Sequence, residues 1–210
     1  FWMDGLIKGA YPQLAIDTYG KTLSDVLQPG DLQPNKLDWL GINYYFNTRI
    51  GPEVSMDNPS RVRVIDKYLG FGNDSNPVGE LTDMSWPITP PGLSGLLTRW
   101  HREYGEALPP IYITENGVAY DDEPGTDGRV RDQRRSDYLN LHLLEVSKAI
   151  EAGVDVRGYF LWSFLDNFEW AVGYAKRFGI VHVNYQTQVR TPKDSAHFYS
   201  EVARTRGANL

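Results

Sequence analysis

A glutamate at the end of a strand-like run is the first residue of this sequence that could do chemistry. Residues 111–114 are β-branched or aromatic, which is typical of a buried strand, and Asn116-Gly117 ends the run with a turn. Glu115 is therefore expected at the C-terminal tip of that strand, where a charge is costly to bury. A carboxylate there can serve as a nucleophile or as an acid or base, or it can simply cap the next loop.

Two further strand-like runs also end in polar and aromatic residues. These residues are Asn43, Tyr45, Trp162, Ser163, Asp166, Asn167, Phe168, Glu169 and Trp170. In α/β barrels, side chains at the C-terminal ends of the strands point into the active site. We therefore expect one concavity at these strand ends, lined by Tyr45, Glu115, Trp162 and Glu169.

The elements that must position these residues alternate along the chain. Strands are predicted over residues 37–46, 110–115 and 156–163, and helices over 93–107, 132–151 and 192–204. This alternation implies parallel strands joined by right-handed crossovers, with the helices packed outside the sheet. The segment 50–91 is rich in Pro, Gly, Asn and Asp, so we expect a long loop that flanks the opening.

Individual residues mark where two of these helices begin and end. Apolar residues at 93, 96, 97, 100 and 104 form a helical stripe, which Pro109-Pro110 terminates. Asp132 is predicted to cap the next helix, and Gly153 to stop it.

Composition excludes several classes of protein. The chain has 210 residues, a net charge of −6, no Cys and four His that are far apart in sequence. This composition predicts no metal site, no disulfide and no nucleic-acid or membrane partner. No signal-peptide pattern is visible, so a cytoplasmic location is expected, although the start Phe1-Trp2 indicates the interior of a longer protein.

Four motifs, in this order and spacing, resemble the family 1 glycoside hydrolases, the β-glucosidase and β-galactosidase group. They are LDWLGINYY, IYITENG, GYFLWSFLDNFEW and GYAKRFGI. The opening FWMDGLIKGAYP is similar to the family's FLDP-x-x-x-G-x-YP stretch, with Gly5 where a proline is usual. The resemblance covers nearly the whole chain.

The resemblance implies a (β/α)8 TIM barrel, of which three parallel strands form only a portion. We therefore expect residues 1–210 to form one partial α/β domain, the C-terminal part of the barrel. It would carry strands six to eight and would be completed by an N-terminal segment that is not in this chain.

The resemblance also implies roles for single residues. Glu115 would be the nucleophile of a retaining, double-displacement hydrolysis of β-glycosides, with Tyr45 and Asn43 as hydrogen-bond donors that keep it ionised. The positions that bind the sugar in the family match Trp162, Glu169, Trp170 and Phe178. A carboxylate can accept from two hydroxyls, and an indole can pack on the apolar face of a pyranose. The alternative is a purely structural aromatic cluster.

Glu169 also bears on the class of sugar. Relatives that act on 6-phosphoglycosides carry Ser at this position, with a Lys and a Tyr further on, whereas this chain has Glu169, Lys176 and Phe178. A carboxylate repels a phosphate dianion, so unphosphorylated sugars are favoured. Glucosidase, galactosidase and fucosidase activities all remain open.

The family's acid/base glutamate lies in a T-x-N-E-P motif, and this chain contains no Asn-Glu-Pro. Two hypotheses follow, neither of which needs a cofactor. In the first, the chain is a β-glucosidase-like hydrolase of a β-linked glucoside once an N-terminal barrel fragment completes it, and the isolated chain is inactive. In the second, it is a catalytically silent fragment or sugar-binding module that pairs with another copy of itself.

Overall fold

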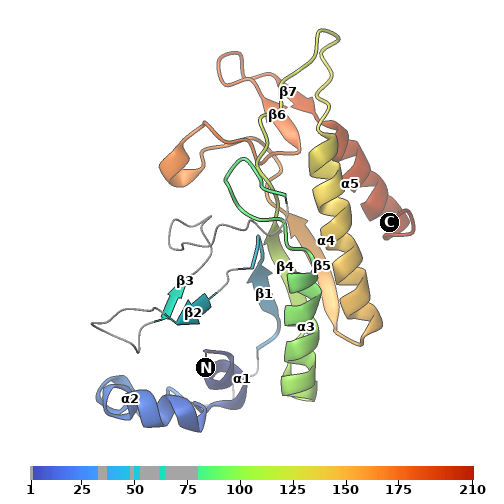
Figure 1. Ribbon diagram of the computed structural model, residues 1–210. Helices are drawn as coiled ribbons and strands as arrows, with labels where there is room; N and C mark the ends of the chain where they lie inside the picture. The colour runs from blue at the N-terminus through green and yellow to red at the C-terminus, as the bar shows by residue number, and fades with distance from the viewer. Residues whose placement is uncertain (1, 33–36, 48–49, 53–61, 65–79) are drawn as a thin grey trace.

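A three-stranded parallel sheet forms the centre of the computed structural model, which describes residues 2–32, 37–47, 50–52, 62–64 and 80–210 (Figure 1). Its strands are β1 (Leu40–Asn43), β4 (Ile111–Asn116) and β5 (Val156–Leu161), in the order β1-β4-β5. Both pairings are parallel, as predicted. The first strand is shorter than the predicted 37–46 because its register against β4 shifts between Ile42 and Asn43.

Three helices lie on one side of this sheet (Figure 1): α3 (Pro91–Tyr104), α4 (Gln133–Glu151) and α5 (Asp194–Thr205). They confirm the three predicted helices. Pro91 starts α3, where its missing N–H costs nothing, and Gly153 follows the C-terminus of α4 with a positive φ of 94°. The helices bury one face of the sheet in a core that contains Ile42, Leu93, Leu97, Ile111, Ile113 and Val146.

The prediction that the Asp132 side chain caps the N-terminus of α4 is wrong. Asp132 occupies the N-cap position but makes no side-chain cap to its own helix. Its Oδ1 instead accepts from the backbone N of Ser195, at 2.8 Å, and its Oδ2 accepts from Arg135 Nε at 2.9 Å. The Asp132 carboxylate thus accepts from a buried N–H in the first turn of α5 and from a buried guanidinium, and it does not accept from the backbone N–H groups of α4.

Several elements were not predicted. They are α1 (Trp2–Lys8), α2 (Gln13–Val26), the antiparallel pair β2 (Ile50–Pro52) and β3 (Val62–Val64), the 3₁₀ turn η3 (Trp170–Val172), and the antiparallel pair β6 (Val181–Val183) and β7 (Arg190–Pro192). The 3₁₀ turn η2 (Gly105–Ala107) forms the end of the predicted helix 93–107. The pair β2–β3 lies within the predicted loop 50–91, much of which is outside the described residues.

The second face of the sheet carries a broad apolar hollow of about 590 Å³, lined by Trp39, Tyr112, Thr114, Phe160, Leu161, Trp162, Ser163 and Phe164. Phe160 is 56% exposed and Phe164 is 68% exposed. Within the described sheet, β1 and β5 are the two outer strands. Among the described helices, none is both long and apolar enough to cross a membrane.

Candidate functional site

Glu115 lies at the C-terminal end of β4 and is held by the segment that follows β1. Tyr45 Oη donates a hydrogen bond of 2.7 Å to Glu115 Oε2, which confirms the predicted contact. The backbone N of Tyr44 donates to the carbonyl of Glu115 at 2.8 Å, so main chain and side chain are both fixed. Burial raises the pKa of the Tyr45 phenol, and the bond to Glu115 raises it further, so Tyr45 keeps its proton and remains a donor.

A second carboxylate lies beside the first, on the loop after β5. Trp162 Nε1 donates to Glu169 Oε1 at 3.1 Å, and Glu169 is buried. Burial raises the pKa of Glu169, the bond from Trp162 opposes that rise, and the charge of Glu115 adds to it. In the described part of the chain, neither Glu115 nor Glu169 forms an ion pair with a Lys, Arg or His. The site therefore joins two acidic groups with only neutral donors.

A close backbone contact brings the tips of β4 and β5 together. The backbone N of Trp162 donates to the carbonyl of Asn116 at 2.9 Å. A Cβ placed on Gly117 would lie 1.6 Å from the carbonyl oxygen of Trp162, so only glycine fits there. The Asn-Gly turn after Glu115 thus ends the strand and also gives room for the neighbouring strand end. The peptide bond between Trp162 and Ser163 is cis.

One predicted contact, the bond from Asn43 to Glu115, is absent among the described residues, whereas the sugar-binding roles of Trp170 and Phe178 stay predictions. Asn43 does not make the predicted bond to Glu115, because after the register shift its Oδ1 accepts from Thr114 Oγ1 at 2.7 Å. Trp170 is 83% exposed, and within the described residues its indole has no hydrogen bond or ring contact. Phe178 is only 2% exposed and packs edge-on against Tyr45, at 6.4 Å between ring centroids, so it supports Tyr45 from behind.

Trp86 belongs to the same cluster and was missed by the sequence analysis. Its ring lies 5.4 Å from that of Tyr45, 5.2 Å from that of Phe46 and 6.0 Å from that of Phe178, measured between centroids. It lies in the segment 80–91, at the end of the predicted flanking loop. An aromatic residue directly before Pro87 in a long polar loop is the signal that could have identified it.

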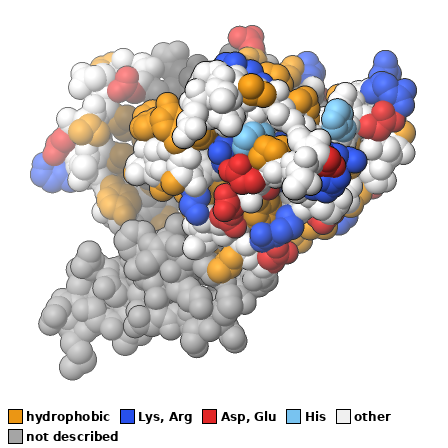
Figure 2. Space-filling view, turned by 90° about the horizontal axis from the view of Figure 1, so that it is seen from above, with side chains coloured by type: hydrophobic (Ala, Val, Ile, Leu, Met, Phe, Trp, Pro, Cys, Tyr) orange, Lys and Arg blue, Asp and Glu red, His pale blue; other side chains and the backbone are white. Residues whose placement is uncertain are grey.

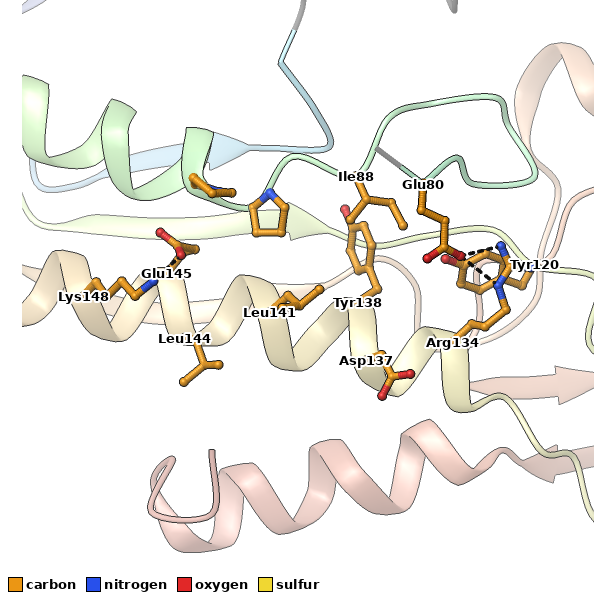
Figure 3. Close-up of a pocket in the computed structure, with 12 residues that line it drawn as sticks. Glu80, Ile88, Tyr120, Arg134, Asp137, Tyr138, Leu141, Leu144, Glu145 and Lys148 are labelled. Atoms are coloured by element: carbon orange, nitrogen blue, oxygen red, sulfur yellow. Dashed lines mark hydrogen bonds and ion pairs between the residues drawn. The ribbon is translucent and has the colours of Figure 1, made fainter. Parts of the chain in front are cut away.

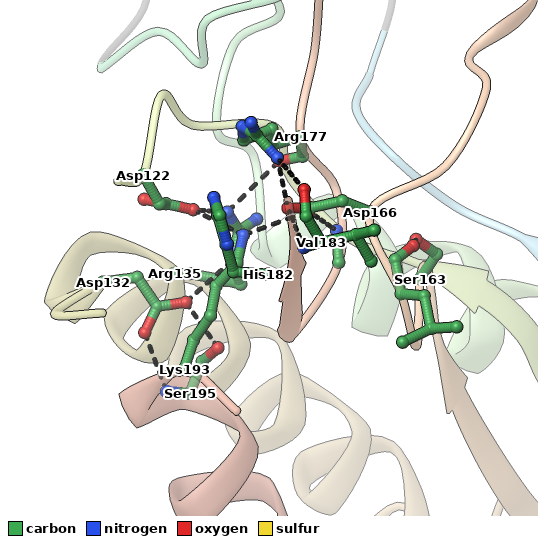
Figure 4. A network of polar contacts seen from close by, with 12 residues as sticks. Asp122, Asp132, Arg135, Ser163, Asp166, Arg177, His182, Val183, Lys193 and Ser195 are labelled. Atoms are coloured by element: carbon green, nitrogen blue, oxygen red, sulfur yellow. Dashed lines mark hydrogen bonds and ion pairs between the residues drawn. The ribbon is translucent and has the colours of Figure 1, made fainter. Parts of the chain in front are cut away.

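A buried charge cluster anchors the loop that carries Glu169 (Figure 4). Asp166 Oδ1 accepts from the backbone N of Gly179 at 3.0 Å and from Lys193 Nζ at 3.1 Å, while its Oδ2 accepts from Arg177 Nη1 at 2.9 Å. Lys193 is fully buried and also donates to Asp122 Oδ2 at 2.9 Å. Burial lowers the pKa of the Lys193 ammonium.

The cluster is balanced in charge. It contains the acids Asp122, Asp132 and Asp166 and the bases Arg135, Arg177 and Lys193. On the molecular face of Figure 2, acidic and basic side chains likewise lie next to one another. Within the described residues, no group of three or more His, Asp or Glu could hold a metal ion.

A separate hollow of about 390 Å³ lies against α4, on the helix side of the sheet (Figure 3). Four of its charged groups are paired: Arg134 Nη2 donates to Glu80 Oε1 at 2.9 Å, and Lys148 Nζ donates to Glu145 Oε1 at 2.6 Å. A fifth, Asp137, accepts from Gln133 Nε2 at 2.8 Å. Glu115, Trp162 and Glu169 do not line it. The strand ends, and not this hollow, are therefore the candidate active site.

Known proteins of similar sequence are glycosidases. Beta-glucosidase A of Thermotoga maritima is 40% identical over 98% of this chain and 43% of its own length, and Beta-glucosidase A of Acetivibrio thermocellus is 39% identical over 99% and 44%. A 6-phospho-beta-galactosidase of Clostridium acetobutylicum is 35% identical over 97% and 46%. The chain thus spans less than half the length of these relatives.

Solved structures agree with the sequence comparison. The family 1 b-glucosidase from Thermotoga maritima has a TM-score of 0.76 and 39% identity, over 98% of this chain and 43% of that one. The same protein in complex with deoxynojirimycin has a TM-score of 0.77. These neighbours are TIM barrels, which confirms the prediction of a partial barrel. The sequence model for Glycosyl hydrolase family 1 matches residues 1–208, and the chain therefore belongs to that family.

Proposed function

We propose that this chain supplies the nucleophile and part of the sugar subsite of a retaining β-glycoside hydrolase. The observation that carries the proposal is the 2.7 Å bond from Tyr45 to Glu115 at the strand ends, with Glu169 and Trp162 beside it. A half-buried glutamate that is held by a neutral donor and has no cation partner in the described residues is suited to attack an electrophilic carbon.

In the proposed reaction, a carboxylate oxygen of Glu115 attacks the anomeric carbon, and the bond to the leaving oxygen breaks. The leaving oxygen takes its proton from a second carboxylic acid, about 5–5.5 Å from the first in retaining enzymes. Water then attacks the glycosyl-enzyme ester, gives its proton to that second group and releases the sugar. Tyr45 would hold Glu115 in its ionised form and in the orientation for attack.

Glu169 and Trp162 would bind the sugar in the cleaved unit. Glu169 Oε1 already accepts from Trp162 Nε1, and its second oxygen can accept from a sugar hydroxyl. The apolar face of the Trp162 indole can pack on the C–H face of a pyranose. The rise in the pKa of Glu169 would be offset when hydroxyl donors replace water around it.

The second carboxylic acid is expected on an N-terminal barrel segment, because this chain has no Asn-Glu-Pro sequence. Two observations support completion by such a segment. The chain covers only 43% of the Thermotoga maritima relative, and the sheet face with the 590 Å³ hollow exposes Phe160 and Phe164. Covering that face and pairing β1 and β5 would remove apolar surface and open strand edges from water.

The substrate is proposed to be an unphosphorylated β-glycoside, although one relative is a 6-phospho-beta-galactosidase. A phosphate dianion near Glu169 would meet a second negative charge, with Glu115 close by. Activity on a 4-nitrophenyl 6-phospho-β-galactoside that exceeds activity on 4-nitrophenyl β-glucoside would contradict this choice.

The test uses a fused polypeptide, hereafter the completed enzyme. Its first part is the N-terminal portion of Thermotoga maritima Beta-glucosidase A, which has no counterpart in this chain. Its second part is residues 1–210 of this chain. The completed enzyme should hydrolyse 4-nitrophenyl β-glucoside. Glu115→Gln should reduce turnover by at least about a thousandfold, because an amide of the same shape cannot attack. Glu201→Gln, an exposed change on α5, is the matched control and should keep full turnover.

Glu115→Gly gives the positive test of the nucleophile. The space it opens can admit azide, which would attack the anomeric carbon of an activated aryl glucoside and restore part of the rate. The 210-residue chain alone should be inactive, because no acid protonates the leaving oxygen. Clear hydrolysis by that chain, or unchanged turnover in Glu115→Gln, would favour a different catalytic group. An inactive completed enzyme that binds glucose would favour the sugar-binding module.

A further inference from the structure

Asn116 follows Glu115 directly, yet its side chain lies on the opposite side of the strand and is fully buried. Its Nδ2 donates to the carbonyl of Tyr44 at 2.7 Å and to Tyr138 Oη at 3.1 Å. Its Oδ1 accepts from Tyr159 Oη at 2.5 Å. One carboxamide therefore joins the segment after β1, helix α4 and strand β5, immediately behind the candidate nucleophile.

Tyr138 reaches the same point from α4. Its hydroxyl accepts from Asn116 and donates to the carbonyl of Tyr45 at 3.3 Å. The ring packs on His142, with centroids 4.0 Å apart, and Tyr138 is 2% exposed. Burial raises the pKa of the Tyr138 phenol, so its proton stays available for the bond to Tyr45.

The two contacts act on a segment that lies beyond the regular strand. β1 ends at Asn43, and the next two carbonyls, those of Tyr44 and Tyr45, accept from the side chains of Asn116 and Tyr138. Side chains thus take the place of a strand ladder at the residue whose hydroxyl donates to Glu115. Together with the 2.8 Å bond from the Tyr44 backbone N to the Glu115 carbonyl, these bonds fix the main chain that carries the Tyr45 side chain, and small displacements at reacting groups have large effects on rate.

We propose that Asn116 and Tyr138 are positioning residues, which hold the Tyr45 main chain so that its hydroxyl meets Glu115. The proposal rests on the function proposed above. Neither residue touches the substrate: both act through Tyr45. The consequence is that the position of the proposed nucleophile depends on helix α4, through the buried side chains of Asn116 and Tyr138.

The test is a double-mutant cycle in the completed enzyme with Tyr138→Phe and Tyr45→Phe. Tyr138→Phe removes only the hydroxyl and should lower kcat by about tenfold with little change in KM, the size expected for one hydrogen bond. In the Tyr45→Phe background the same change should have almost no further effect, because the group through which it acts is gone. Equal losses in both backgrounds would overturn the proposal.

Tyr199→Phe is the matched control. Tyr199 Oη also donates to a tyrosine carbonyl, that of Tyr159, at 2.8 Å, but this contact is on β5 and not at Tyr45. It should lower thermal stability about as much as Tyr138→Phe does while leaving kcat unchanged. A fall in kcat that matches that of Tyr138→Phe would show that any lost buried hydroxyl has this effect, and would overturn the positioning role.

A second readout does not depend on turnover. With 3-fluorotyrosine at position 45, the fluorine NMR resonance should move on Tyr138→Phe and stay in place on Tyr199→Phe. An unmoved resonance would contradict the proposal even if the completed enzyme is inactive. Conversely, full turnover in Glu115→Gln would reject the proposed nucleophile, while a moved resonance would still show that Tyr138 sets the position of Tyr45.

Discussion

Two regions of this molecule hold buried or half-buried carboxylates, and they do so in opposite ways. Around Lys193, three aspartates meet three cations, and Asp166 alone accepts four bonds, from Gly179, Lys193, Arg177 and Val183. At the strand ends, Glu115 and Glu169 lie near each other with a phenol and an indole N–H as their donors. Both regions belong to the same loop system, because only two residues separate Asp166 from Glu169.

The difference separates a structural use of charge from a chemical one. A buried acid whose oxygens already accept from cations and backbone N–H groups is not available to another partner. At the strand ends, burial raises the pKa of Glu169, the charge of the half-buried Glu115 adds to that rise, and both groups retain free lone pairs. The charge cluster therefore holds the loop in place, and the strand-end pair is left to interact with a ligand.

Removing the buried cation should have the largest effect on stability. Lys193→Met leaves Asp122 and Asp166 undercompensated, and the free energy of unfolding of the completed enzyme should fall by about 3–5 kcal/mol. Denaturant unfolding measures this change.

Adding Asp122→Asn to Lys193→Met restores the balance of charge and should recover part of the loss. Lys21→Met, which breaks an exposed pair with Asp25, should cost less than about 1 kcal/mol. Equal losses at both lysines would contradict the comparison.

His142 sharpens the comparison because it is a buried base that stays neutral. It is fully buried, its Nε2 has no hydrogen-bond partner among the residues that the structure describes, and burial lowers its pKa from 6.5 to about 4. The unfolded chain binds this proton first as the pH falls, so stability is full above pH 6.5 and is lost between pH 6.5 and 4. The shift corresponds to about 3 kcal/mol.

The measurement is the free energy of unfolding at pH 7 and pH 5 for three forms of the completed enzyme. His142→Phe should show a smaller loss between the two pH values than the unchanged protein, whereas Leu141→Gln, an exposed change on the same helix, should show the same loss. A pH dependence that is unaffected by His142→Phe would mean that other groups cause it.

A matched pair of amide substitutions gives the smallest effects but the clearest contrast. Asp166→Asn should cost about 2 kcal/mol, because Arg177 and Lys193 lose their shared carboxylate. Glu169→Gln should be neutral or stabilising by up to about 1 kcal/mol at pH 7, because it removes one of two repelling charges. In the completed enzyme, Glu169→Gln should raise KM for the glucoside. A similar loss of stability in both variants would contradict the distinction between a structural charge cluster and a strand-end pair that is available to a ligand.

The sequence was sufficient for the sheet and its helices because those signals are local. Alternation of strand and helix patterns predicted β1, β4 and β5 and the helices α3, α4 and α5, and the motif at Glu115 predicted its contact with Tyr45. Helix α2 was missed because its inward stripe is weak: it buries Ala15 while Leu14 and Ile16 are exposed.

The charge cluster could not be predicted for a different reason. Lys193 is 71 residues from Asp122 and 27 from Asp166, and no periodicity connects positions so far apart. Asp132 shows the same limit: its type and place favoured a local cap, but a donor 63 residues away took the bond. The roles of Trp170 and Phe178 in binding sugar stay predictions, because the first is exposed and the second lies behind Tyr45.

The contact between Gly117 and the carbonyl of Trp162 has a practical consequence for changing specificity by mutagenesis. Any side chain at position 117 would push the end of β5 away from the end of β4, so Trp162 would move relative to Glu115. Libraries that vary position 117 should return almost only glycine. The neighbouring loop offers Phe168, Trp170 and Tyr174, which are all more than half exposed. Diversity is best introduced at these three positions, because new side chains there displace water and leave the backbone contact intact.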